Sequence, residues 1–147
     1  MQVSDLLTLD RIAGDVPAAS KKRLLEKVSA LIARGDSALS EGEVFESLLS
    51  RERLGSTGVG HGVAIPHGRM RDLDRTVGAF VRLADSVDYD AVDGEPVDLL
   101  FAMVVPEEST EELSTLAEMF SDSELLGRLR KAEAPDEMYV LLKDWRR

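Results

Sequence analysis

Apolar residues recur at helical spacing in two segments near the start of the chain. Ser20 has the chemistry of a helix N-cap, and the apolar positions behind it continue to Gly35, which suits a helix stop. Ser40 and Glu43 form a capping-box pattern that opens a second helix, which we expect to end near Arg53. In both segments the spacing gathers the apolar residues on one face, so both helices are expected to pack against a core.

The middle of the chain carries the shorter apolar runs that are typical of β-strands. Residues 62–67, GVAIPH, predict a short strand that stops at its proline, which cannot donate to a strand ladder. Residues 76–83 are rich in β-formers, and residues 97–105 are apolar almost throughout, as expected for a central strand that is buried on both faces. Residues 86–96 between them suggest a short strand and a turn at Asp93–Gly94.

The last third of the chain returns to helical spacing. Capping-box pairs at Ser109–Glu112 and Ser121–Glu124 predict two helix starts, and Pro135 suits the first turn of a third helix. Two helices, a set of strands and three further helices predict a layered domain of the α/β (α+β) class. No linker composition interrupts residues 1–147, so we expect a single domain.

Length, composition and charge exclude several classes of function. The chain has 147 residues, 44% of them hydrophobic and 31% charged, which suffices for a core without crosslinks. A formal net charge of −10 disfavours nucleic-acid binding, because it repels the phosphate backbone. The longest purely apolar run, residues 99–105, is too short to span a bilayer, and no signal-peptide pattern opens the chain. We therefore expect a cytoplasmic protein without membrane insertion.

The segment GSTGVGHGVAIPHG, residues 55–68, contains five of the eleven glycines and both histidines. It leads from a predicted helix into a predicted strand, the reverse of a dinucleotide loop, and it lacks the Gly-Lys-Ser/Thr ending of a P-loop. Ser56, Thr57 and several unencumbered backbone N–H groups could form an anion-binding concavity, or the segment could be a flexible connection. Two histidines without cysteine or a carboxylate motif do not predict a zinc site, so no metal is expected.

His67 is the candidate for chemistry in this segment. Pro66 stiffens the backbone before it, and Gly68 leaves room beside the ring. A neutral imidazole near pH 7 is a good nucleophile, and next to an anion site it favours phosphoryl acceptance. Arg51, on the last turn of the preceding helix, could clamp a phosphate, or could be a solvated residue that interacts with the helix dipole. On position alone, a structural or surface role for the histidine stays open.

The segment RERLGSTGVGHGVAIPHGR, residues 51–69, resembles the histidine motif of enzyme IIA of the bacterial phosphoenolpyruvate-dependent phosphotransferase system, mannitol/fructose type. Further segments, including YDAVDGEPVDLLFAMVVPEE and GRLRKAEAPDEMYVLL, resemble its nitrogen-regulatory branch, and the likeness covers nearly the whole chain. The resemblance implies a mixed β-sheet flanked by helices on both sides. It further implies a phosphotransferase component with a phosphohistidine intermediate on His67 and with Arg51, Ser56 and Thr57 around the phosphate. The implied donor is a histidine phosphocarrier protein (HPr/NPr-like), itself charged by enzyme I, and no cofactor is implied.

Two positions depart from the pattern of the family that the chain resembles. Many members carry a second active-site histidine at the start of the helix after the VPE segment. The equivalent position here is Glu112, in a helix that looks about one turn shorter than usual. Glu112 could orient His67, slow transfer by charge repulsion, or act only as the capping partner of Ser109, which is the interpretation that we favour. His61 stands where asparagine is frequent, and it could line the pocket or cap the loop.

Three functions are compatible with these observations. The first is a regulatory IIA protein of the nitrogen type, whose phosphorylation state selects its target proteins. The second is a IIA component that passes phosphate to a IIB subunit for sugar uptake of the fructose/mannitol type. The third is a degenerate interaction module that no longer accepts phosphate. The overall likeness favours the first, and the missing second histidine keeps the third open.

Overall fold

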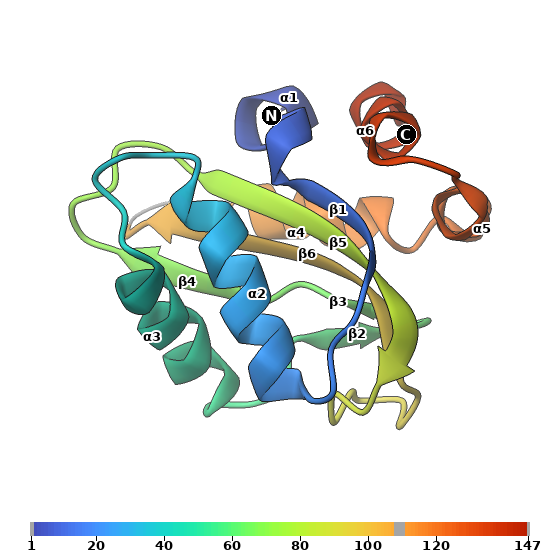
Figure 1. Ribbon diagram of the computed structural model, residues 1–147, viewed down its shortest axis with the longest axis horizontal. Coiled ribbons are helices and arrows are strands. Elements are labelled where there is room, and N and C mark those ends of the chain that lie inside the picture. Colours follow the sequence, from blue (N-terminus) through green and yellow to red (C-terminus); the bar gives the residue numbers. More distant parts are fainter. Residues whose placement is uncertain (1, 108–110, 147) are drawn as a thin grey trace.

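A six-stranded mixed β-sheet forms the centre of the computed structural model, which describes residues 2–107 and 111–146 (Figure 1). The strands are β1 (Ile12–Val16), β2 (Gly58–Gly60), β3 (Val63–Ala64), β4 (His67–Met70), β5 (Val77–Val87) and β6 (Val97–Pro106). They run in the order β1-β5-β6-β3-β2, and β4 also pairs with β6. β6 is antiparallel to β5 but parallel to both β3 and β4, so it connects the two halves of the sheet.

Helices cover both faces of this sheet. They are α1 (Val3–Leu6), α2 (Lys21–Ala33), α3 (Glu41–Glu52), α4 (Glu111–Met119), α5 (Ser123–Lys131) and α6 (Pro135–Asp144), with a 3-10 turn, η1, at Leu9–Arg11. Figure 1 shows α2 and α3 on the near face and α4 behind the sheet. The predicted mixed sheet between two helical layers is confirmed.

Two hydrophobic cores follow from the alternation of side chains along β5 and β6. Ala79 and Val81 pack towards α2 and α3, whereas Phe80 between them belongs to the core under the C-terminal helices. There its ring lies 6.4 Å from that of Phe101 and 6.2 Å from that of Phe120, measured between ring centroids. Because both faces are covered, β6 is buried along nearly its whole length, as its continuous apolar run predicts.

The caps of the first two long helices are also confirmed. The hydroxyl of Ser20 accepts a hydrogen bond from the backbone N–H of Arg23, and that of Ser40 accepts one from Glu43. α3 ends at Glu52 with Arg53 as its C-cap, where the sequence predicts the stop. This end matters for the site, because the last turn of α3 leads directly into the glycine-rich segment.

Several local predictions differ from the structure. The short strand does stop before Pro66, but it covers only Val63–Ala64 of the predicted residues 62–67, because His67 already belongs to the next strand, β4, and the carbonyl of Pro66 accepts a hydrogen bond from β6. The short strand expected within residues 86–96 is wrong, because β5 itself continues to Val87, although the turn is present and Gly94 has φ +74°. The cap of α5 is Asp122, one residue after the predicted Ser121, because its carboxylate accepts two backbone N–H groups of the first turn.

Candidate functional site

His67 is the first residue of β4, and β6 holds it in place through the pairing of His67 with Met103. The imidazole is half-buried, and its Nδ1 lies 2.8 Å from the carbonyl oxygen of Ile65. A carbonyl oxygen can only accept, so Nδ1 carries the proton in this contact. Nε2 is then the ring nitrogen with a free lone pair, which makes it the nucleophilic atom of the neutral imidazole.

A cavity of about 590 Å³ opens beside this imidazole, between the C-terminal half of α3 and β4. Its lining combines three cationic or imidazole groups with small hydroxyl side chains and one exposed leucine. The residues are Glu46, Ser47, Ser50, Arg51, Leu54, His67, Gly68 and Arg69. The structure thus brings Arg51 and His67 together, as the sequence predicts. It adds Arg69, which the sequence did not single out although it follows His67 by two residues.

Arg51 is tied to the glycine-rich segment rather than extended into solvent. Its Nη1 donates to the carbonyl oxygen of Gly55 at 2.8 Å, which fixes the guanidinium at the entrance of the segment. A fixed guanidinium can bind a phosphate with little loss of side-chain entropy. The contact is equally compatible with a helix-end role, so the phosphate clamp by Arg51 stays a prediction.

Burial lowers the pKa of His67, and the nearby charges act on it in both directions. After burial, the largest influence is the hydrogen bond to Ile65, which raises the pKa. The positive charges of Arg51 and Arg69 lower it, and the negative charge of Glu52 raises it. The net effect is a pKa below the ordinary histidine value of 6.5, so the ring is neutral and nucleophilic at pH 7.

The hydroxyl groups of Ser56 and Thr57 do not line this cavity. The Ser56 hydroxyl donates to the carbonyl oxygen of Tyr89 at 3.0 Å and accepts from the N–H of Gly58. Thr57 is buried, and both its N–H and its hydroxyl are bonded to the carboxylate of Glu52. Their expected role in holding phosphate stays a prediction, and these contacts do not favour it.

His61 lies in the turn between β2 and β3, outside the lining of the His67 cavity. Its φ of +59° is in the left-handed region, where asparagine, aspartate and histidine are enriched among non-glycine residues. Its N–H donates to Asp93, and its carbonyl oxygen accepts from Arg130 at 2.5 Å. Arg130 also forms a bidentate pair with Asp98, so this turn is held from two directions. These contacts are made by the backbone of His61, so a role of its imidazole in capping the loop stays a prediction.

Glu112 contacts the start of β5, on the other side of β6 from His67. Its carboxylate accepts a hydrogen bond from the hydroxyl of Thr76 at 3.0 Å, and Thr76 directly precedes β5. β5 and β4 lie on opposite sides of β6, and Glu112 is absent from the lining of the His67 cavity. This contact joins α4 to the start of β5, which favours a structural role for Glu112. Its predicted capping partner, Ser109, lies outside the described residues.

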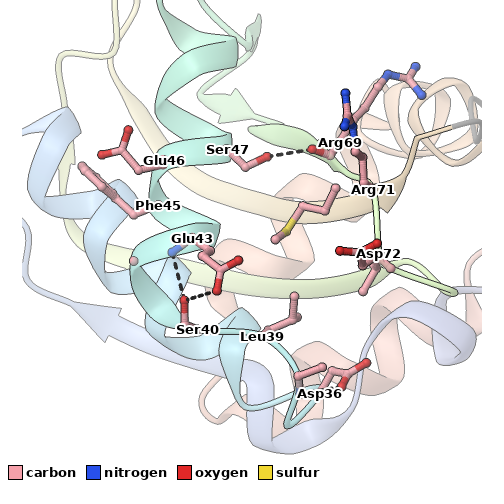
Figure 2. A pocket seen from close by; sticks show the side chains of 14 residues that line it. Asp36, Leu39, Ser40, Glu43, Phe45, Glu46, Ser47, Arg69, Arg71 and Asp72 are labelled. Carbon is pink, nitrogen blue, oxygen red and sulfur yellow. Dashed lines mark hydrogen bonds between the residues drawn. The ribbon is translucent and has the colours of Figure 1, made fainter.

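A second, larger pocket continues along α3 from the His67 cavity (Figure 2). It measures about 860 Å³ and shares Glu46, Ser47 and Arg69 with that cavity. The Ser47 hydroxyl donates to the carbonyl oxygen of Arg69 at 3.3 Å and so holds α3 against β4 at the boundary between the two. The hollow surface around His67 is therefore larger than a phosphate group alone would fill.

None of the helices within residues 2–107 and 111–146 has the length and apolar character of a membrane span. The same residues contain no group of three or more histidine, cysteine, aspartate or glutamate side chains that is placed to hold a metal ion.

Comparison with known proteins gives consistent matches over almost the full chain. A "Nitrogen regulatory protein" of Escherichia coli K12 is 42% identical over 149 residues, covering 98% of this chain and 91% of that protein. One of Pseudomonas aeruginosa is 40% identical over 148 residues, covering 98% and 96%. The crystal structure of nitrogen regulatory protein IIA-Ntr from Neisseria meningitidis superposes with a TM-score of 0.89 at 43% identity, covering 95% and 98%.

More distant structures share the fold. The mannitol IIA of Escherichia coli superposes with a TM-score of 0.79 at 23% identity, covering 92% of this chain and 98% of that one. The family model for "Phosphoenolpyruvate-dependent sugar phosphotransferase system, EIIA 2" matches residues 5–145. The resemblance that residues 51–69 carry is thus confirmed, and the chain belongs to the EIIA 2 family of the phosphoenolpyruvate-dependent sugar phosphotransferase system.

Proposed function

We propose that this chain is a regulatory IIA protein that accepts a phosphoryl group on Nε2 of His67 from a histidine phosphocarrier protein. The observation that carries the proposal is the hydrogen bond between Nδ1 and the carbonyl of Ile65. It leaves Nε2 unprotonated in a cavity that Arg51 and Arg69 also line. The relatives at 40–42% identity carry the name nitrogen regulatory protein, which supports regulation rather than sugar uptake as the role.

The transfer needs no proton to leave the accepting ring. The lone pair on Nε2 attacks the phosphorus of the donor's phosphohistidine, and a new N–P bond forms while the donor's N–P bond breaks. The electron pair of the broken bond returns to the imidazole nitrogen of the donor. The His67 ring gains positive charge, which its Nδ1–H shares with the carbonyl oxygen of Ile65.

The two arginines supply the electrostatic part of the mechanism. Phosphoryl transfer depends mainly on positioning and on stabilising the charge of the transferred group. The guanidinium of Arg51, held by the carbonyl of Gly55, is placed to bind phosphoryl oxygens as they approach His67. Arg69 adds a second positive charge from the β4 side of the same cavity.

The proposal is tested with purified enzyme I, a histidine phosphocarrier protein and phosphoenolpyruvate. Intact mass spectrometry should detect one phosphoryl group that is labile in acid and stable in base. His67→Ala should abolish it. His61→Asn is the matched control, because asparagine tolerates the left-handed backbone at this exposed turn, and it should be labelled like the wild type. Labelling that persists in His67→Ala would overturn the assignment.

The same labelled protein separates the remaining functions. A IIB domain of the fructose or mannitol type is added to phosphorylated protein, and transfer to that domain would favour the sugar-uptake alternative. A chain that folds but takes no label from the phosphocarrier would be the degenerate interaction module. The regulatory role predicts labelling without efficient transfer to IIB.

A further inference from the structure

Glu52, the last residue of α3, is a buried carboxylate that the transfer step does not use directly. Its side chain is only 3% exposed, and it forms an ion pair with Lys21 at 2.8 Å. It accepts the backbone N–H of Thr57 at 3.2 Å and the hydroxyl of Tyr89 at 3.0 Å. The hydroxyl of Thr57 donates to the same carboxylate. A buried charge with this many donors is fully satisfied, and breaking the set would be costly.

An unbroken series of hydrogen bonds leads from this carboxylate to the imidazole. Glu52 holds the N–H of Thr57, and the carbonyl oxygen of Thr57 accepts the N–H of Ile65 at 3.0 Å. The carbonyl oxygen of Ile65 in turn lies 2.8 Å from Nδ1 of His67. Each bond fixes the backbone of the next residue in the series, so a displacement at Glu52 is transmitted to the position of the ring, while its charge acts on the ring through space.

The start of the glycine-rich segment is also fixed by neighbouring residues of one helix turn. Arg51 holds the carbonyl oxygen of Gly55, and Glu52 holds the N–H of Thr57 two residues further on. Lys21 connects this arrangement to α2, where its ammonium group also lies 4.4 Å from the centre of the Tyr89 ring. The segment is thereby anchored to both α2 and α3 rather than free to move between them.

We infer that Glu52 is a positioning residue for His67, which fixes the Nδ1–H tautomer and the orientation of the ring through Thr57 and Ile65. The consequence for the transfer rate rests on the proposed function, whereas the consequence for the ring itself does not. The carboxylate also provides negative charge near a ring that becomes positive when Nε2 is phosphorylated. A stabilised positive ring in the product favours the transfer step.

The charges around His67 predict the direction of the effect. Burial, Arg51 and Arg69 all lower the pKa of His67, and Glu52 opposes them. Glu46, which also lines the cavity, stays in place in the variants described below. Removing the charge of Glu52 should therefore lower the pKa of His67 further below its ordinary value. Removing the charge of Lys21 should raise it, because the carboxylate then acts on the ring without its paired cation.

The test uses histidine ring ¹⁵N NMR of the unphosphorylated full chain, in the wild type and in Glu52→Gln. The wild type should show the Nδ1–H tautomer at His67. The variant should show a mixture of tautomers and a lower pKa. Asp98→Asn is the matched control, because it breaks a different partly buried ion pair, that of Asp98 with Arg130. This pair is not part of the hydrogen-bond series from Glu52 to His67, so the His67 spectrum should stay unchanged. An unchanged tautomer and pKa in Glu52→Gln would overturn the inference.

Lys21→Met is the second variant. It tests the role of Glu52 even if Glu52→Gln does not fold. A rise in the pKa of His67 is expected, and no change would overturn the inference. If Glu52 only stabilised the fold, both variants would shift the pKa of His67 in the same direction, because both break the ion pair between Lys21 and Glu52. In phosphocarrier assays, kcat of folded Glu52→Gln should fall about tenfold or more with KM nearly unchanged. Wild-type protein that takes no label would contradict the proposed function but leave the NMR result intact.

Discussion

Gly68 is the position where one added methyl group should disturb the site most. A Cβ built on Gly68 would lie 2.9 Å from the carbonyl carbon of Ser47, and it would also collide with the Ser47 hydroxyl. The hydroxyl can rotate away, but the carbonyl carbon is backbone of α3, so the helix itself has to move away from β4. Such overpacking typically costs about 1–3 kcal/mol. In a chain of this size, that cost corresponds to a melting temperature lower by roughly 2–12 °C.

The displaced helix also carries Arg51, so Gly68→Ala should affect transfer as well as stability. A shift of the guanidinium relative to His67 is expected to slow phosphorylation about tenfold or more, because small misplacements of reacting groups are costly. The assays are thermal unfolding followed by circular dichroism and the initial rate of labelling by the phosphocarrier protein. Both are measured on the same preparation.

Gly42→Ala is the control for this prediction. Gly42 is in the first turn of the same helix, and a Cβ there meets nothing within 4 Å. Alanine should therefore stabilise the helix by up to about 1 kcal/mol and leave transfer unchanged. A Gly68→Ala protein that melts and transfers like the wild type would refute the close packing of α3 on β4 as the reason for this glycine.

The remaining predictions concern acid stability, a surface ion pair and the aromatic core. Since the pKa of folded His67 is lowered, the unfolded chain binds more protons below the ordinary value of 6.5. The free energy of unfolding should therefore decrease as the pH is lowered from about 7 to 5.5, which urea titrations at the two pH values would measure. The decrease should be smaller in His67→Gln, which lacks the titrating group. Arg130→Gln removes a half-exposed bidentate pair and the contact to the His61 turn, and should lower the free energy of unfolding by about 1 kcal/mol. Phe120→Ala removes a buried ring that packs on two others, and should cost about 3–5 kcal/mol in the same titration.

The elements predicted well are those with a local signal. The N-caps Ser20 and Ser40, the start of α6 at Pro135 and the continuous apolar run of β6 each depend on residues that are close in sequence. β1 was not predicted, because IAGDV has neither an apolar run nor alternation, and its strand character comes from parallel pairing with β5 far along the chain. The cap of α5 was misplaced by one residue because both a serine and an aspartate can occupy that position.

The candidate site divides in the same way. His67 and Arg51 are recognisable from the motif, and they line one cavity. Ser56 and Thr57 were predicted to face a phosphate, but their hydroxyls bond to Tyr89 and Glu52, and no local pattern indicates that Tyr89 lies beneath the segment. Arg69, which lines the cavity, and Glu52, which influences the ring, both stand within residues 51–69, so the charged positions of the motif carry a signal for them.

The sequence by itself determined the class of fold, the order of most elements and the choice of His67 as the candidate histidine, because periodicity, capping and a specific motif are properties of neighbouring residues. Only the tertiary structure decided what surrounds that histidine. Gly68 was expected to leave room beside the ring, and it does line the cavity, but the space that its own Cβ would take is filled by Ser47 of α3. Parallel pairing with β6 and the packing of α3 on β4 bring together residues that are distant in sequence, and burial then sets the charge and hydrogen bonding of the ring.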